Sequence, residues 1–311
     1  MYFAGRLAIP VPAVTAFDAA AENALGVPYM IQNRVIGTNL YSCFPTLPHS
    51  QQVQIARELG AIFRQMLDVR SPVGGRVVLD GKKGATRIAP IRWRKDDGDD
   101  DDDNSNTASE QQQTPPQQSP YQWLSTLFAA EHAADPSGTL WSEFDRMAHE
   151  LDAGGWFSQV WYSLAHLDLA PRNILINEAA SLENALCARR PIITAVLDWD
   201  SAVLAPCFLS CYPPLWLWGW RDDEDEDERT ANDDPGTPQG RQLKMQFEEA
   251  AGTNYVRFAY GAPYRLARRL VRFAIDGLRS NEDYKEATAM LREWAQVCSA
   301  EEGQDIKKHA K

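Results

Sequence analysis

Two short polar blocks, each attached to a short apolar run, constrain the fold of this chain more than any other feature. The first block extends from His166 to Asn173, and the apolar run 174–176 follows it directly. The second block begins at Asp198 and comes directly after the apolar run 192–197. Apolar runs of this length and composition predict β-strands. If the two strands form a hairpin, Asp198 returns beside Asn173, and residues distant in the sequence share one site.

Three side chains in these blocks match the needs of phosphoryl transfer to a hydroxyl group. That reaction uses one carboxylate to accept the hydroxyl proton, and an amide oxygen and a second carboxylate to hold Mg²⁺ against the nucleotide phosphates. In this order Asp168 is the predicted catalytic base, and Asn173 and Asp198 are the predicted metal ligands. Ordinary turn residues are the alternative interpretation, but the full spacing and the two flanking strands argue against it. His166 is predicted to be structural, and Asp200 is either an accessory group or a solvated carboxylate.

The spacing H-x-D-x-x-x-x-N is that of the kinase catalytic loop, and Asp198 stands where the metal-binding Asp of the D-F-G element falls. Because the second block reads Asp-hydrophobic-acidic, the chain resembles the aminoglycoside phosphotransferase/choline kinase family of the protein-kinase-like superfamily, from about residue 9 to about residue 295. An aromatic segment over 206–220 is similar to that of fungal-type members. The resemblance implies an α+β protein-kinase-like fold with a curtailed N-terminal β lobe and a mainly helical C-terminal lobe. It also implies ATP and Mg²⁺ as cofactors and a small-molecule hydroxyl as acceptor.

Residues 28–37 are predicted to form a strand that runs into a linker. In the resembling family this strand enters the hinge, whose backbone N–H and C=O groups bind adenine. The resemblance therefore implies that the backbone of Gln32, Asn33 and Arg34 binds the nucleotide. The alternative is an ordinary hairpin strand without a ligand, which this segment alone does not exclude.

The chain departs from the family pattern before the hinge. Kinase-like enzymes carry a Gly-rich loop and a strand Lys there, and both contact the phosphates. The first Lys of this chain is Lys82, Arg6 is the only basic residue before Arg34, and some thirty residues are too few for the usual strands and helix. Loss of these groups weakens phosphate stabilisation. A catalytically impaired pseudokinase, serving as a binding module, or a truncated gene product therefore remains the alternative. A metal hydrolase built on His166 and Asp168 is disfavoured because no clustered His completes a ligand set.

The net charge of −12 is concentrated in two acidic runs. Residues 96–103 contribute −7 and residues 222–234 contribute −8, which leaves about +3 for the rest of the chain. No basic stripe predicts nucleic-acid binding, and no polybasic patch or long apolar segment predicts a membrane contact. Five Cys without C-x-x-C spacing, and the lack of a leader pattern, favour reduced thiols in a cytoplasmic protein.

We predict three parts: residues 1–36 as the remnant of the N-terminal lobe with the hinge, 37–300 as the helical lobe that carries the catalytic loop, and 301–311 as a polar tail. The low-complexity inserts 96–120 and 221–240 are predicted to be disordered. Hydrophobic periodicity predicts helices over 50–68 with Ser50 as N-cap, 121–134, 140–153, 242–260, 264–278 and 282–297, and short strands over 14–17 and 77–79.

Two clusters have alternative interpretations. The aromatic residues of 206–220 suit core packing or an aromatic cage for a quaternary ammonium group, and packing is favoured. The basic residues at 265, 268, 269 and 272 suit phosphate binding or pairing with surface acids, and pairing is favoured.

Overall fold

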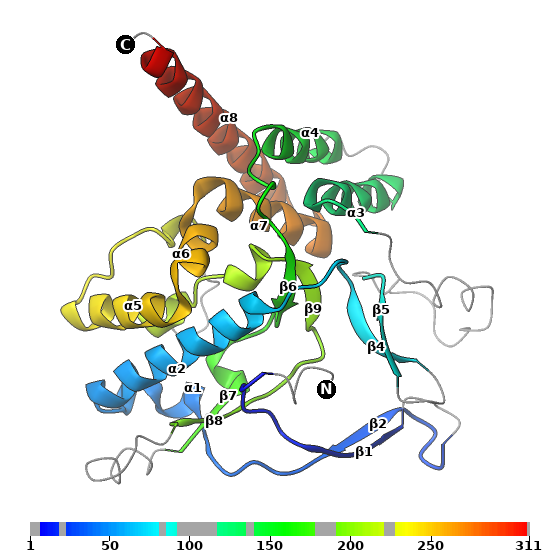
Figure 1. Cartoon of the computed structure of the whole chain (residues 1–311), viewed down its shortest axis with the longest axis vertical. Coiled ribbons are helices and arrows are strands. Elements are labelled where there is room, and N and C mark those ends of the chain that lie inside the picture. The colour runs from blue at the N-terminus through cyan, green and yellow to red at the C-terminus, as the bar shows by residue number, and fades with distance from the viewer. Residues whose placement is uncertain are drawn as a thin grey trace. The chain divides into compact units, whose positions relative to one another are not determined.

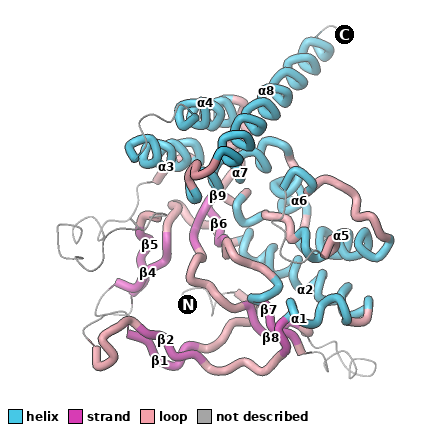
Figure 2. Tube along the Cα trace, turned by 180° about the vertical axis from the view of Figure 1, so that it is seen from behind, coloured by secondary structure: helices cyan, strands magenta, loops and turns pink. Residues whose placement is uncertain are grey.

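The computed structural model describes residues 7–18, 23–80, 85–91, 117–134, 140–177, 191–220 and 228–309 (Figure 1). The described residues form helices and short antiparallel sheets joined by loops (Figure 2), which agrees with the predicted α+β class. The chain divides into two compact units. The first comprises Met1–Val69, His166–Ala202 and Pro213–Val256, and the second comprises Arg70–Ala165, Val203–Tyr212 and Arg257–Lys311.

The first unit begins with a two-stranded hairpin. Strand β1 (Val14–Asp18) pairs antiparallel with β2 (Tyr29–Gln32). The two strands lie where strands were predicted, over 14–17 and within 28–37. The turn between them is closed by the Gly26 N–H, which donates to the Asn23 carbonyl over 3.0 Å. Gly26 has a φ of +71°, a left-handed conformation that glycine adopts without strain.

A three-stranded antiparallel sheet follows in the first unit, in the order β3-β7-β8. Its strands are β3 (Thr38–Asn39), β7 (Ile174–Ile176) and β8 (Ile193–Val196). The hairpin predicted from the two apolar runs is therefore confirmed, with Ile174 opposite Val196. Both of these side chains are fully buried, whereas Leu175 and Thr194 between the buried positions are half-buried, so one face of the hairpin packs in the core.

Helices α2 (His49–Asp68) and α5 (Pro238–Ala251) pack against each other in the first unit. The contact is close, because a Cβ at Gly60 would strike the backbone of α5. The ring of Phe63 on α2 meets that of Phe247 on α5 edge-on, with centroids 5.4 Å apart. The short helix α1 (Leu40–Cys43) directly follows β3.

Three predictions for this unit were wrong in detail. Pro48, rather than Ser50, occupies the N-cap of α2, and Ser50 lies inside the helix. The helix predicted over 242–260 is two helices, because Gly252 has a φ of +88° and separates α5 from α6 (Thr253–Tyr260). Residues 228–240, predicted to be disordered, contain a 3₁₀ helix (Glu228–Thr230) and the first turn of α5, which Thr237 caps. A Thr-Pro step is a helix start signal that the acidic composition of the segment obscured.

The second unit contains two antiparallel strand pairs, β4 (Arg76–Asp80) with β5 (Ala85–Ala89), and β6 (Tyr162–Ala165) with β9 (Val203–Pro206). Strand β4 covers the predicted strand over 77–79. Strand β5 was not among the predicted strands.

Four helices complete the second unit: α3 (Pro120–Ala134), α4 (Leu140–Ala153), α7 (Ala262–Asp276) and α8 (Asn281–His309). Helices α3 and α4 match their predictions within one residue, whereas α8 continues twelve residues beyond the predicted end (Figure 1). Phe144 on α4 stacks on Phe273 of α7, with centroids 5.5 Å apart. None of the described helices combines the length and hydropathy that a membrane span requires.

The basic cluster of α7 pairs with acids, as predicted; three of its four side chains are buried, whereas that of Arg272 is 48% exposed. Arg265 and Arg269 both donate to Glu293 of α8, over 3.0 and 2.8 Å, and Arg272 donates to Glu286 over 2.7 Å. The fourth basic residue of the cluster, at 268, donates instead to the backbone carbonyls of residues 208, 258 and 259. The guanidinium groups therefore serve the packing of the second unit.

The aromatic segment also packs as predicted. Phe208 is fully buried in the second unit, and its ring stacks on that of Phe157. In the first unit Trp216 is 8% exposed and meets the ring of Phe44 edge-on, with centroids 5.7 Å apart. Of the insert predicted over 96–120, residues 96–116 lie outside the described part of the chain.

Candidate active site

The predicted catalytic loop and both predicted metal ligands lie in the first unit, at one end of the β7–β8 hairpin. Pro171–Asn173 form a 3₁₀ turn that leads directly into β7. The Asn173 N–H closes this turn by donating to the Ala170 carbonyl over 2.9 Å. Pro171 and Asn173 are buried, so the turn holds the Asn173 backbone in a fixed place before the strand begins.

The Asn173 amide is directed by its contact with Asp168. Its Nδ2 donates to the backbone carbonyl of Asp168 over 2.8 Å and to the Oδ2 carboxylate atom over 2.9 Å. Because both N–H bonds of the amide point to Asp168, the Oδ1 atom of Asn173 is turned away from it. An oxygen of this kind is a suitable ligand for Mg²⁺.

Asp198 is brought to the same place by backbone pairing. The Leu197 N–H donates to the Asn173 carbonyl over 2.8 Å, so Asp198 directly follows a residue bonded to Asn173. The backbone of Asp198 has a φ of +58°, a left-handed conformation that Asp adopts more readily than most residues. The side chain is exposed, so solvent ions can reach its carboxylate. The structure thus brings Asp168, Asn173 and Asp198 together, and their roles remain a prediction.

His166 joins the catalytic loop to the end of β8. Its Nε2 donates to the Leu197 carbonyl over 2.9 Å, and its Nδ1 accepts from the Asp168 N–H over 3.3 Å. The ring is 2% exposed and lies against that of Trp199, with centroids 4.6 Å apart. A neutral ring with its proton on Nε2 satisfies both bonds. His166 therefore has the structural position that the sequence predicted.

We expect the stability of the protein to fall as the pH falls below 6.5, because of His166. Burial lowers the pKa of His166 below its ordinary value of 6.5, although the Leu197 carbonyl and the charges of Asp168 and Asp198 oppose this shift. The unfolded chain then binds a proton more readily than the folded one, so the contribution of the neutral ring is complete above 6.5 and is lost as the pH falls through the lowered pKa. The measurement is the midpoint of urea unfolding at about pH 7.5 and about pH 5.5.

The control for this pH dependence is His166→Gln, which has no titrating ring. The difference between the two unfolding midpoints should be smaller in the variant than in the wild-type chain. An equal difference in both proteins would show that other groups cause the decline.

Two side chains that the sequence did not single out also support the site. Arg172 donates from Nη2 to Oδ1 of Asp168, so each carboxylate oxygen of Asp168 accepts one side-chain hydrogen bond. Glu58 of α2 holds the start of β8, because its carboxylate accepts from the N–H groups of Ile192 and Ile193 over 2.8–2.9 Å. Glu58 lies within a regular helical pattern, and Arg172 within the loop motif, so neither had a distinguishing signal in the sequence.

The predicted hinge residues lie at the open end of the β1–β2 hairpin. Gln32 is opposite Val14, and the Asn33 N–H donates to the Ala13 carbonyl over 2.8 Å. This N–H is therefore used within the hairpin and is not available to a nucleotide. Among the residues that the structure describes, no hydrogen bond joins Gln32, Asn33 or Arg34 to the catalytic loop.

The segment after the hinge runs against the site hairpin. A Cβ at Gly37 would lie 2.9 Å from both the Ile176 carbonyl and the Thr194 Oγ1, so only glycine allows this approach without a shift. The Thr194 hydroxyl also donates to the Ile36 carbonyl over 3.5 Å.

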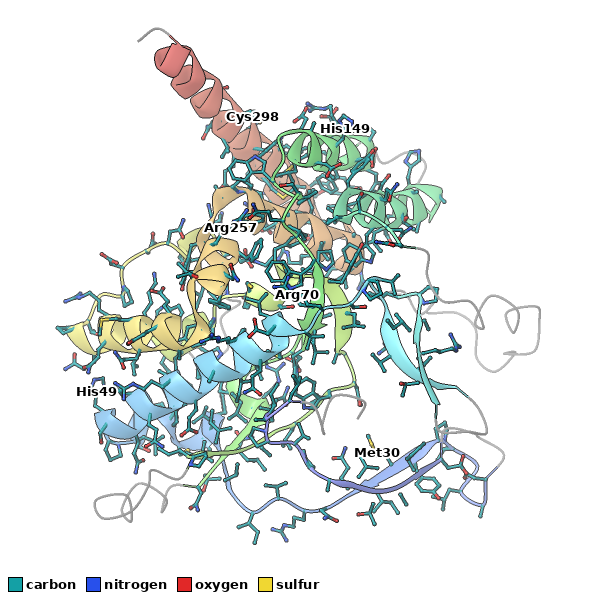
Figure 3. All side chains as sticks on the ribbon, in the orientation of Figure 1. Met30, His49, Arg70, His149, Arg257 and Cys298 are labelled. Carbon is teal, nitrogen blue, oxygen red and sulfur yellow. The ribbon has the colours of Figure 1, made fainter. Side chains whose placement is uncertain are left out.

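The described His residues do not form a metal centre of their own. His49 on α2 bonds to Gln242, and the exposed His149 on α4 meets the ring of Tyr121 (Figure 3). Within the described ranges, no group of three or more His, Cys, Asp or Glu side chains is placed to hold a metal ion.

The sequence matches the family model described as "Phosphotransferase enzyme family" over residues 1–243. The chain belongs to this phosphotransferase family. Membership confirms the family predicted from the two polar blocks and, together with the observed helices and small sheets, the kinase-like fold. No curated protein matches the chain in sequence.

Several solved structures show a distant likeness to the chain. One is the GDP complex of a wild-type aminoglycoside 2′-phosphotransferase, with 14% identity, coverage of 95% of this chain and 79% of that chain, and a TM-score of 0.44. A Ralstonia eutropha JMP134 protein described as an aminoglycoside phosphotransferase has 14% identity, coverage of 96% and 80%, and a TM-score of 0.48. A thermostable aminoglycoside phosphotransferase mutant in complex with AMP-PNP and hygromycin B has 14% identity, coverage of 95% and 80%, and a TM-score of 0.46.

Proposed function

We propose that this member of the phosphotransferase family transfers the γ-phosphoryl group of ATP to a hydroxyl group of a small molecule, in a reaction that depends on Mg²⁺. The observation that carries the proposal is the connected arrangement of Asp168, Asn173 and Asp198. Asn173 bonds to the Asp168 carboxylate through its side chain, and to the residue before Asp198 through its backbone. Phosphoryl transfer to a hydroxyl needs a base and two metal ligands close together, and kinase-like enzymes carry them in this order along the chain.

The side chains at the site fit Mg²⁺. The Asn173 Oδ1 and the Asp198 carboxylate are hard oxygen ligands, which this ion prefers. Mg²⁺ usually keeps several waters and binds phosphate oxygens besides one or two protein groups, so a larger cluster of acidic side chains is not required. When bound, the ion neutralises charge on the nucleotide phosphates.

Asp168 is the proposed base of the reaction. Its carboxylate takes the proton of the acceptor hydroxyl as the hydroxyl oxygen bonds to the γ-phosphorus and the bond from that phosphorus to the ADP oxygen breaks. Asn173 holds the carboxylate in position through the bond to Oδ2. For the adenine we propose the backbone of the hinge, Gln32 to Arg34, without the N–H of Asn33.

The proposal is tested by the thermal stability of the protein with ATP and Mg²⁺, compared with ATP and a chelator. We expect a Mg²⁺-dependent increase in the wild-type chain, because ligand at a hundredfold excess over its dissociation constant stabilises the folded state by about 2.7 kcal/mol. Asp198→Asn should abolish this increase, since the substitution removes a charged ligand of the ion.

The matched control for the Asp198 variant is Asp68→Asn, which neutralises an exposed carboxylate at the end of α2. This variant should keep the full Mg²⁺-dependent increase. If Asp198→Asn also keeps it, the assignment of the metal site is wrong. A Mg²⁺-dependent increase without phosphoryl transfer to any acceptor would favour the alternative, a nucleotide-binding module that has lost catalysis.

A further inference from the structure

We infer that Arg172 binds the terminal phosphate of the nucleotide, and that its contact with Asp168 is the resting position of a side chain that exchanges partners when the nucleotide arrives. This inference rests on the function proposed above for the same loop. Its starting point is the ion pair between the Arg172 Nη2 and the Asp168 Oδ1, four residues apart. Asp168 is the only side-chain partner that the structure gives Arg172 within the described ranges.

The backbone of Arg172 is fixed by its surroundings, whereas its side chain is largely exposed to solvent. Its carbonyl accepts from the Asn39 Nδ2 over 2.5 Å, and its two neighbours in the 3₁₀ turn, Pro171 and Asn173, are buried. The Arg172 side chain, in contrast, is 63% exposed. The guanidinium can therefore rotate away from Asp168 without displacing Asn173 from its place before β7.

Exchange of partners is favourable for such a side chain. An exposed ion pair contributes only about 0–1 kcal/mol, so the contact with Asp168 is readily broken. A terminal phosphate carries more charge and offers several oxygens, and the planar guanidinium can bind two of them at once. Charge-assisted hydrogen bonds of this type are roughly twice as strong as neutral ones.

Phosphoryl transfer also requires a cation at this place, since charge is spread over the oxygens of the transferred group. Besides Arg172, the Arg and Lys side chains in the described part of the first unit are those of Arg34, Arg57, Arg64, Arg229, Arg241 and Lys244. Arg229 lies in the 3₁₀ helix Glu228–Thr230, Arg241 donates to the Pro235 carbonyl, and Lys244 donates to the carbonyls of residues 231 and 233. Arg57 donates to Gln246, and Arg64 pairs with Asp68. Arg34 lies at the predicted hinge. Arg172 contacts the proposed base, Asp168, through its side chain, and it directly precedes the proposed metal ligand Asn173 in the chain.

The exchange has a consequence for Asp168. When Arg172 moves to the phosphate, Oδ1 of Asp168 loses its hydrogen-bond donor, while Oδ2 keeps the bond from Asn173. The acceptor hydroxyl can then donate to Oδ1. Nucleotide binding would thereby make Oδ1 of Asp168 available to the acceptor hydroxyl, while the bond from Asn173 to Oδ2 keeps the carboxylate in place.

The test compares the binding of ATP and AMP to the full chain by calorimetry in the presence of Mg²⁺, with Arg172→Gln and with Arg64→Gln as the matched loss of an exposed positive charge. We expect Arg172→Gln to bind ATP about tenfold to a hundredfold more weakly, since a hydrogen bond between charged groups is lost. AMP binding should be unchanged, and Arg64→Gln should behave like the wild-type chain. Unchanged ATP affinity in Arg172→Gln, or an equal loss for ATP and AMP, would overturn the inference.

The competition between Asp168 and the phosphate is tested with Asp168→Asn. This substitution should strengthen ATP binding when Arg172 is present, because it releases the guanidinium, and should do so less in the Arg172→Gln background. An equal gain in both backgrounds would show that no exchange occurs.

The outcomes also separate this inference from the proposed function. If the wild-type chain does not bind ATP, both are wrong. If it binds ATP with a Mg²⁺ dependence that Asp198→Asn removes, while Arg172→Gln binds ATP normally, only the role of Arg172 is wrong.

Discussion

Asp168→Asn is expected to lower the rate of phosphoryl transfer by about 10²–10⁴-fold, the range that a positioned general base contributes. The amide has nearly the size and shape of the carboxylate, and its oxygen can still accept one of the two hydrogen bonds that Arg172 and Asn173 make with Asp168. It cannot take the proton of the acceptor hydroxyl. The loss should therefore appear in kcat, measured as ADP release over a panel of small hydroxyl compounds.

Nucleotide binding separates this effect from a loss of structure. The Asp168→Asn variant should retain the Mg²⁺-dependent thermal stabilisation by ATP, because Asn173 and Asp198 are still present. A variant that transfers phosphate at the wild-type rate would show that Asp168 is not the base. A variant that loses the stabilisation as well as the transfer would show that Asp168 belongs to the binding site rather than to the proton transfer.

Glu293→Gln is expected to destabilise the folded chain by about 3 kcal/mol, because it removes the negative charge that two buried guanidinium groups share. The side chains of Arg265 and Arg269 are 10% and 5% exposed, and both donate to the Glu293 carboxylate. The neutral amide of Gln cannot replace the charge that both guanidinium groups contact, and breaking a buried ion pair by removing one partner costs about 3–5 kcal/mol. Glu286, 3.8 Å from Arg269, remains as a second acid and places the expected loss at the lower end of this range. The free energy of urea unfolding measures this loss.

The matched control for Glu293 is Glu282→Gln on the same helix. Glu282 pairs with Lys285, and both side chains are largely exposed, at 80% and 74%. An exposed pair of this kind contributes less than about 1 kcal/mol, so the control should unfold at nearly the wild-type urea concentration. Equal effects of the two substitutions would mean that the α7–α8 contacts of Glu293 do not stabilise the protein.

The proximity of the candidate site residues could be predicted from the sequence because they lie in two short blocks with their strands attached, while their roles stay a prediction. The apolar runs specify the β7–β8 hairpin, and the hairpin specifies the neighbourhood of Asn173 and Asp198. No long-range packing information is needed for this step, since Asp168 and Asn173 are five residues apart and the strands supply the rest. Local patterns were likewise sufficient for α2, α3 and α4, whose buried faces recur at helical spacing.

The contacts that support the site could not be predicted in this way. Glu58 reaches β8 from a helix more than a hundred residues earlier in the chain, and such pairs have no local signal. Strand β5 depends on its partner β4 rather than on its own composition, because tertiary pairing overrides a weak propensity. The break at Gly252 was missed because an isolated Gly within a helical pattern is often tolerated.

The far end of the β7–β8 hairpin is closed independently of the chain that connects its strands. The Asn177 N–H donates to the Ile192 carbonyl over 2.9 Å, and Glu58 binds the N–H groups at positions 192 and 193. Lengthening a connection whose ends are already fixed costs little, since the entropy of loop closure grows slowly with length. An insertion after Asn177 is therefore expected to leave the pairing of β7 with β8, and the candidate site at the other end of the hairpin, unchanged.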